Sequence, residues 1–87
     1  MRIVFARKFV KSLAKIPAPI RERYYERLIL FKQDRRHPLL NDHGLGGEWA
    51  GHRSVNVTGD YRAIYHEVSA EIFRFVAIGT HPQLYGR

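Results

Sequence analysis

The chain opens with a short strand pattern followed by a helical one. Ile3 and Phe5 alternate with other residues in segment 1–5, which predicts a β-strand with these two side chains on one face. Phe9, Leu13 and Ile16 then recur at helical spacing, which predicts a helix from about residue 7 to residue 15. Both elements have an apolar face that the rest of the chain must cover.

A second, longer helix is predicted from residue 19 onwards. Pro19 suits the first turn of a helix, and the residues after it form one apolar stripe. The stripe consists of Ile20, Tyr24, Leu28 and Phe31, with Tyr25 and Ile29 widening it. Segment 32–37 ends the helix, because Pro38 disfavours helical backbone in the residue before it. Arg35 and Arg36 fall at this end, where the helix dipole favours cations and where they could also contact phosphate.

Three further strands are predicted after a glycine-rich loop. The glycines between residues 44 and 51 indicate the loop, which Leu45 and Trp49 are expected to pin against the core. The strands are predicted at about residues 52–57, 61–68 and 72–79. The short turns at 58–60 and 69–70 connect them as antiparallel hairpins. The whole pattern predicts an α+β fold, in which an N-terminal helical hairpin packs on one face of a twisted, mainly antiparallel sheet.

The hairpin turns also predict which residues face one another. In the first hairpin Asn56 faces Arg62 and His52 faces His66, and in the second Arg62 faces Ala77. Alternation then assigns these residues to the face that the helices cover: Val55, Val57, Ala63, Tyr65, Ile72, Val76 and Ile78. It assigns these to the opposite face: Ser54, Asn56, Arg62, Ile64, Phe73 and Phe75.

Polar side chains in the middle of this second face predict a concave site around Arg62. The meander brings the Asp60 turn and the end of the third strand to the same edge of the sheet. Asp60, Thr80 and His81 should therefore cluster beside Asn56 and Arg62.

Composition restricts the compartment and the partners. The 87 residues suffice for one small domain, 1–87, and not for two. The chain has no cysteine, no apolar run near the roughly 20 residues that span a bilayer, and no secretory signal pattern at its start. These features predict a cytoplasmic protein without membrane contact. The net charge of +7 favours nucleic acid as a partner, although an acidic protein would satisfy the same charge.

The titratable side chains are suited to phosphodiester transfer without a metal. RNA carries its own nucleophile, the 2′-OH, so the protein must supply cations for the phosphate and groups that move protons. His81, Asp60 and Arg62, with His43 from the loop, would be sufficient, although His43 could instead bond only to backbone. His52 and His66 lack further ligands for a metal, so no cofactor is expected.

Three spaced motifs resemble a bacterial toxin family. The segments D-H-x-L-x-G-x-W-x-G-x-R, V-x-x-D-Y and R-F-x-x-x-G-T-H-x-x-L-Y-G resemble the RelE/ParE toxin superfamily, and in particular its YafQ-type mRNA interferases. The resemblance implies a ribosome-dependent endonuclease that cuts mRNA and is held inactive by an acidic antitoxin. It implies that His81 is the general acid, that Asp60 and His43 assist proton transfer and positioning, and that Tyr85 orients the nucleotide.

The chain departs from this family pattern at Asn56, where the family has a histidine. An asparagine can position a 2′-OH or a phosphate by hydrogen bonds, but it cannot shuttle a proton at neutral pH. Two other functions remain open on this fold: a ParE-like inhibitor of DNA gyrase without enzymatic activity, and a plain RNA-binding module. The Asp60 and His81 pair favours the nuclease, because a binding protein needs no titratable cluster.

Overall fold

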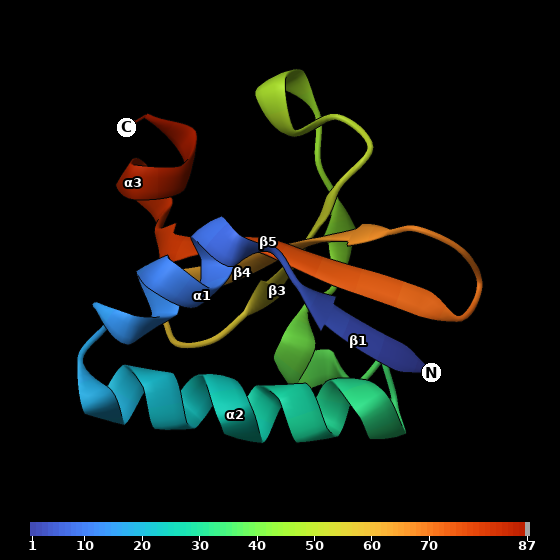
Figure 1. Ribbon diagram of the computed structural model, residues 1–87, viewed down its shortest axis with the longest axis horizontal. Coiled ribbons are helices and arrows are strands. Elements are labelled where there is room, and N and C mark those ends of the chain that lie inside the picture. The colour runs from blue at the N-terminus through green and yellow to red at the C-terminus, as the bar shows by residue number, and fades with distance from the viewer. Residues whose placement is uncertain (87) are drawn as a thin grey trace.

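The computed structural model, which describes residues 1–86, places two helices on one face of a five-stranded sheet (Figure 1). The elements in chain order are β1 (Arg2–Phe5), α1 (Arg7–Ala14), α2 (Ala18–Gln33), the 3-10 turn η1 (Pro38–Leu40), β2 (His43–Gly44), the 3-10 turn η2 (Gly47–Trp49), β3 (Arg53–Asn56), β4 (Tyr61–Glu67), β5 (Ile72–Thr80) and α3 (His81–Tyr85). The strand order is β1-β5-β4-β3-β2, with β1 parallel to β5 and the other neighbours antiparallel. The predicted α+β fold is confirmed.

An aromatic core joins the helices to the sheet. Phe9 of α1 and Phe31 of α2 are buried, and the Phe31 ring lies 4.9 Å from that of Tyr65, measured between centroids. The predicted α2 stripe is therefore correct along its centre. Its widening is wrong, because Tyr25 and Ile29 are 47% and 59% exposed. Each follows a stripe residue by one position, about 100° further round the helix, where the sheet no longer covers it.

The register of the β3–β4 hairpin is as predicted. Asn56 pairs with Arg62 across the two strands. The rings of His52 and His66, one step beyond the paired strands, lie 5.4 Å apart. The compact turn between the strands fixes this register locally, so the polar side chains fall on the face away from the helices.

The register of the β4–β5 hairpin differs from the prediction. Arg62 pairs with Gly79 rather than Ala77, and a bulge separates the pairs Ile64–Ala77 and Tyr65–Phe75. The connection spans residues 68–71 instead of a two-residue turn, and the bulge then inserts an extra residue into β5.

The bulge reverses the two faces of β5 on its N-terminal side. Phe73 and Phe75, predicted on the far face, are buried in the core below the helices, while Ile72 and Val76 are only partly buried. Residues on the other side of the bulge keep their predicted faces, as the buried Ile78 shows. None of the helices within residues 1–86 has the length and apolar character that crossing a membrane requires.

Candidate functional site

An open cavity of about 380 Å³ gathers residues from four parts of the chain: segment 41–46, β3, β4 and α3. It lies beside segment 43–46 and α3, which both rise from the face of the sheet away from α2 (Figure 1). Its lining consists of Asn41, His43, Leu45, Gly46, Ser54, Arg62, His81 and Tyr85. Of the predicted site residues, His43, Arg62, His81 and Tyr85 therefore share one cavity, whereas Asn56 and Asp60 do not line it.

Asn41 fixes the imidazole of His43. Its backbone has the left-handed conformation, with φ 45° and ψ 47°, which asparagine tolerates better than most residues. In this conformation its carbonyl oxygen lies 2.7 Å from Nδ1 of His43. Because a carbonyl oxygen can only accept, Nδ1 carries a proton, and Nε2 remains for other partners. The backbone bond expected as an alternative for His43 is present, and the ring still lines the cavity.

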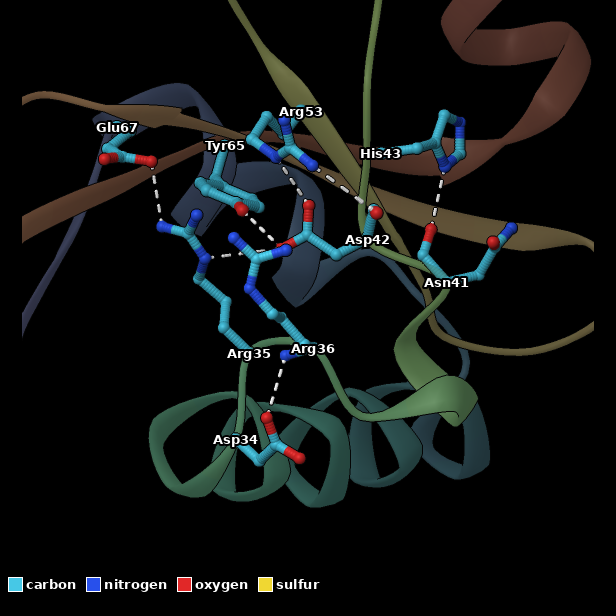
Figure 2. Close-up of polar contacts among 9 residues, drawn as sticks. All are labelled: Asp34, Arg35, Arg36, Asn41, Asp42, His43, Arg53, Tyr65 and Glu67. Atoms are coloured by element: carbon cyan, nitrogen blue, oxygen red, sulfur yellow. Dashed lines mark hydrogen bonds and ion pairs between the residues drawn. The ribbon is translucent and has the colours of Figure 1, made fainter.

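Asp42 holds β2 in place from the opposite side (Figure 2). Its side chain is only 6% exposed, and its carboxylate lies 2.7 Å from Nε of Arg53 and 3.7 Å from Nε of Arg35. The Tyr65 hydroxyl donates to the same carboxylate. Burial raises the pKa of the Tyr65 phenol, and the bond to Asp42 raises it further, so Tyr65 stays a donor. Four segments of the chain thus meet at the residue before His43.

The sequence contained a signal for this network. Asp42 and Arg53 are the first and last residues of the motif D-H-x-L-x-G-x-W-x-G-x-R, and they form an ion pair. Arg35, expected at the helix end, also bonds to Glu67 at 2.8 Å. The hydrogen bond to Asp42 raises the pKa of Arg53. The motif therefore specifies the support of His43 as well as the histidine itself.

The short helix α3 positions His81 and Tyr85. Thr80 and Gln83 form a reciprocal cap, in which the Thr80 N–H donates to Gln83 Oε1 and the Gln83 N–H donates to Thr80 Oγ1. Gly79 makes room for this cap, since a Cβ there would lie 2.8 Å from Gln83 Oε1. The rings of His81 and Tyr85, one turn apart, lie 4.5 Å apart between centroids.

Trp49 connects the glycine-rich segment to α3. Its indole N–H donates to the Leu84 carbonyl over 2.9 Å. The prediction that Leu45 and Trp49 pin the loop against the core is wrong, because neither packs on the core and Trp49 is instead bonded to α3. This bond ties together two segments that both contribute to the cavity, since Leu45 and Gly46 precede Trp49 and Tyr85 follows Leu84.

The turn after β3 holds the guanidinium of Arg62. Nη1 donates to the carbonyl oxygens of Thr58, Gly59 and Tyr61 over 2.8–3.1 Å. All three bonds use one nitrogen, so Nε and Nη2 make no hydrogen bond within residues 1–86 and can bind a ligand. Arg62 is thus a fixed cation on the predicted face.

Asp60 meets His81 through the backbone. Its carbonyl oxygen accepts the His81 N–H at 3.2 Å, which confirms that the turn and the end of β5 lie together. Its carboxylate is exposed and has no ion pair with His81 within residues 1–86. The structure therefore corrects the expected Asp60–His81 side-chain contact.

Ser54 was not singled out by sequence reasoning. It is fully buried on the cavity side, and its hydroxyl has no partner within residues 1–86. Asn56, two residues further along β3, has a buried and unpaired Oδ1. Alternation assigned Ser54 and Asn56 to the polar face. It could not show that their polar atoms would be buried without a hydrogen-bond partner, because buried polar atoms usually have one. Within residues 1–86 no three His, Cys, Asp or Glu side chains are placed to hold a metal ion.

Comparison with known proteins identifies the class to which this fold and cavity belong. Residues 1–86 match the family described as "Bacterial toxin of type II toxin-antitoxin system, YafQ". The chain is thus a toxin of the type II toxin–antitoxin class. Within that class it belongs to the YafQ family, as the three motifs predicted. No curated protein sequence matches the chain.

Solved structures share the same architecture. A mutant YafQ from E. coli has 24% identity and a TM-score of 0.76, covering 99% of this chain and 100% of that one. YafQ in the E. coli DinJ–YafQ complex has 25% identity and a TM-score of 0.73, with the same coverage. A chain of the RelB–RelE antitoxin–toxin complex from Methanococcus jannaschii has 20% identity and a TM-score of 0.74, covering 95% of both chains. The predicted RelE-like fold is thereby confirmed.

Proposed function

We propose that this toxin is a metal-independent endoribonuclease that cuts mRNA on the ribosome by attack of a 2′-OH on the adjacent phosphate. One observation supports the proposal: His43, Arg62, His81 and Tyr85 converge on a single open cavity. The cavity thereby offers two imidazoles, a fixed guanidinium and an aromatic ring. These are the groups that phosphodiester transfer to an internal nucleophile needs from a protein.

In this mechanism His43 removes the proton from the 2′-OH. Its Nδ1 donates to the Asn41 carbonyl, so the neutral ring has its lone pair on Nε2. A neutral imidazole is a suitable base near physiological pH. The left-handed backbone of Asn41 thereby determines which nitrogen does the chemistry.

His81 donates a proton to the 5′-oxygen that leaves. Its ring contacts that of Tyr85 at a tilt of 58°, and its backbone N–H is held by the Asp60 carbonyl. Arg62 stabilises the charge on the phosphate through Nε and Nη2. Asp60 positions His81 through its carbonyl oxygen, and Tyr85 orients the nucleotide with its ring.

An acidic antitoxin is the proposed inhibitor. The solved relatives include two toxins in complex with their antitoxins, DinJ–YafQ and RelB–RelE. The net charge of +7 on this chain favours an acidic partner in the same way as it favours RNA. The toxin would act in the cytoplasm, where ribosomes translate.

Expression of the toxin without an antitoxin tests the proposed target. We expect growth to stop because translation stops, and incorporation of radiolabelled amino acids to fall before that of nucleotides. Co-expression of an antitoxin encoded beside the toxin should restore growth. A selective loss of DNA synthesis with altered supercoiling would instead support a gyrase inhibitor and contradict the proposal.

Asn56→His tests the departure from the family pattern. Asn56 does not line the cavity, but it pairs with Arg62, which does, and its Oδ1 is buried without a partner, so an imidazole there would lie beside the proposed phosphate ligand. We expect cleavage of ribosome-bound mRNA to proceed at least as fast as in the parent protein, measured by primer extension. Asn56→Ala is the matched control and should be slower. If both variants are slower than the parent protein by the same factor, Asn56 acts through its amide and the expectation is wrong.

A further inference from the structure

A second cavity adjoins the one that holds the histidines. Its volume is about 420 Å³, and Asn41 lines both cavities. Arg35, Arg36 and Arg53 supply three guanidinium groups to its walls, against the single carboxylate of Asp42. The catalytic proposal uses none of these arginines: Arg35 and Arg53 form ion pairs with Asp42, and Arg36 has no assigned role.

Two of the arginines are held as rigid donors. Arg35 and Arg53 both contact Asp42 through Nε, at 3.7 and 2.7 Å. Arg35 uses Nη1 for Glu67, and Arg53 directs Nη2 towards the Asp42 carbonyl. Nη2 of Arg35 and Nη1 of Arg53 therefore make no hydrogen bond within residues 1–86. A guanidinium fixed in this way loses little entropy when it binds an anion.

Two further donors complete the cavity. Arg36 is exposed and forms no ion pair within residues 1–86. The Leu39 N–H donates to Nδ1 of His37, so the proton of the neutral His37 ring is on Nε2, which can donate to a ligand. In Figure 2 the guanidinium groups of Arg35, Arg36 and Arg53 all lie around Asp42. The carboxylate thus holds two of the three guanidinium groups, and Arg36, which has no ion pair within residues 1–86, leaves the cluster positively charged.

We propose that this cavity binds a phosphodiester group of the RNA strand whose neighbouring nucleotide occupies the catalytic cavity. The inference rests on the proposed function and extends it to a second binding position. Planar guanidinium groups match phosphate oxygens in geometry as well as in charge. An RNA strand has a phosphate at every nucleotide. A strand that has one nucleotide in the catalytic cavity and continues past Asn41 would therefore bring a neighbouring phosphate to the second cavity. Continuity between the two cavities favours RNA over an acidic protein.

Arg36→Gln is the appropriate variant, because Arg36 is exposed and supports no other side chain. Binding is measured by fluorescence anisotropy on a short fluorescein-labelled RNA with 2′-O-methyl sugars, which cannot be cut. On single-stranded RNA, each phosphate contact steepens the fall of the log binding constant with log salt concentration by about 0.7. The ratio of the parental to the variant binding constant should therefore rise about eightfold when the salt concentration is lowered about twentyfold. Arg23→Gln, with the same charge change in the middle of α2, should keep the parental slope.

Neutral methylphosphonate groups, placed at one phosphate at a time, locate the contact. One position should weaken binding more in the parent protein than in Arg36→Gln, because the variant has already lost one of the contacts to that phosphate. Equal effects of every position in both proteins would overturn the proposal. The proposal would also be overturned if the binding constant of Arg36→Gln depended on salt concentration as steeply as that of the parent protein.

Two comparisons separate this inference from its alternatives. If Arg36→Gln weakens binding of the antitoxin and leaves RNA binding unchanged, the cavity docks an acidic protein and the proposal is wrong. If the parent protein cuts ribosome-bound mRNA while Arg36→Gln binds RNA as tightly as the parent, only this inference fails. If RNA binding depends on Arg36 but the parent cuts no mRNA, the proposed function fails and the phosphate site stands.

Discussion

His81→Gln should remove most of the cleavage activity while leaving the fold intact. Glutamine keeps a polar side chain of similar reach, but it cannot donate a proton to the leaving oxygen at neutral pH. General acid–base groups typically contribute about 10²–10⁴-fold, so the rate should fall by that order. The exposed side chain and the backbone bond to Asp60 indicate that folding tolerates the change. Primer extension on ribosome-bound mRNA measures the rate.

His52→Gln is the matched control for this experiment. His52 contacts His66 and Trp49 outside the cavity, so its replacement should leave the rate unchanged. The parent protein should produce 2′,3′-cyclic phosphate ends, because the 2′-OH is the attacking group. Cleavage by His81→Gln at the parental rate would show that His81 moves no proton in the reaction.

Asp42→Ala should lower the free energy of unfolding more than any change in the cavity. The substitution leaves Arg35 and Arg53 without their shared carboxylate and removes the acceptor of the Tyr65 hydroxyl. Removal of one partner from a buried ion pair costs about 3–5 kcal/mol, and the 24% and 37% exposure of the two arginines reduces this to about 2–3 kcal/mol. For a domain of this size the melting temperature should fall by roughly 8–24 °C.

Glu67→Gln provides the comparison for Asp42→Ala. It removes the other carboxylate from Arg35, but Glu67 is 42% exposed, so the loss should be at most about 1 kcal/mol. Urea denaturation followed by circular dichroism measures both variants. Equal losses would mean that the Asp42 cluster does not stabilise the fold. The cleavage activity of Asp42→Ala, measured below its melting temperature, should also fall. The strand β2 that contains His43 has only two residues, so the position of His43 depends on the contacts of Asp42.

Local patterns in the sequence determined the helices and one hairpin. The spacing of Phe9, Tyr24 and Phe31 predicted the apolar faces of α1 and α2, because helical periodicity is set by residues a few positions apart. The turn at residues 58–60 similarly predicted that Asn56 pairs with Arg62. The motifs resembling YafQ-type toxins then predicted the family and the site residues His43, His81 and Tyr85, which line one cavity.

Only the tertiary structure decided the register of β5. The extra residue of the bulge moves the side chains on its N-terminal side to the opposite face of the sheet. The sequence pattern of the strand carries no sign of this shift, so the burial of Phe73 and Phe75 could not be predicted. The choice between the two faces depends on which one packs better against α2, and that packing involves residues far apart in the chain. The exposed positions of Tyr25 and Ile29 have the same origin, because the sheet alone determines how much of α2 is covered.

The side-chain network of the site likewise depends on tertiary contacts. Arg35, Asp42 and Tyr65 meet although they belong to separate elements, and no local pattern indicates that one carboxylate serves two arginines. The exclusion of Asp60 from the cavity follows from the same kind of detail, since its carbonyl rather than its carboxylate meets His81. The sequence thus predicted four of the residues that line the cavity, His43, Arg62, His81 and Tyr85, but not Ser54. The tertiary structure decided which of them touch, because contact depends on the three-dimensional path of segments that the sequence separates.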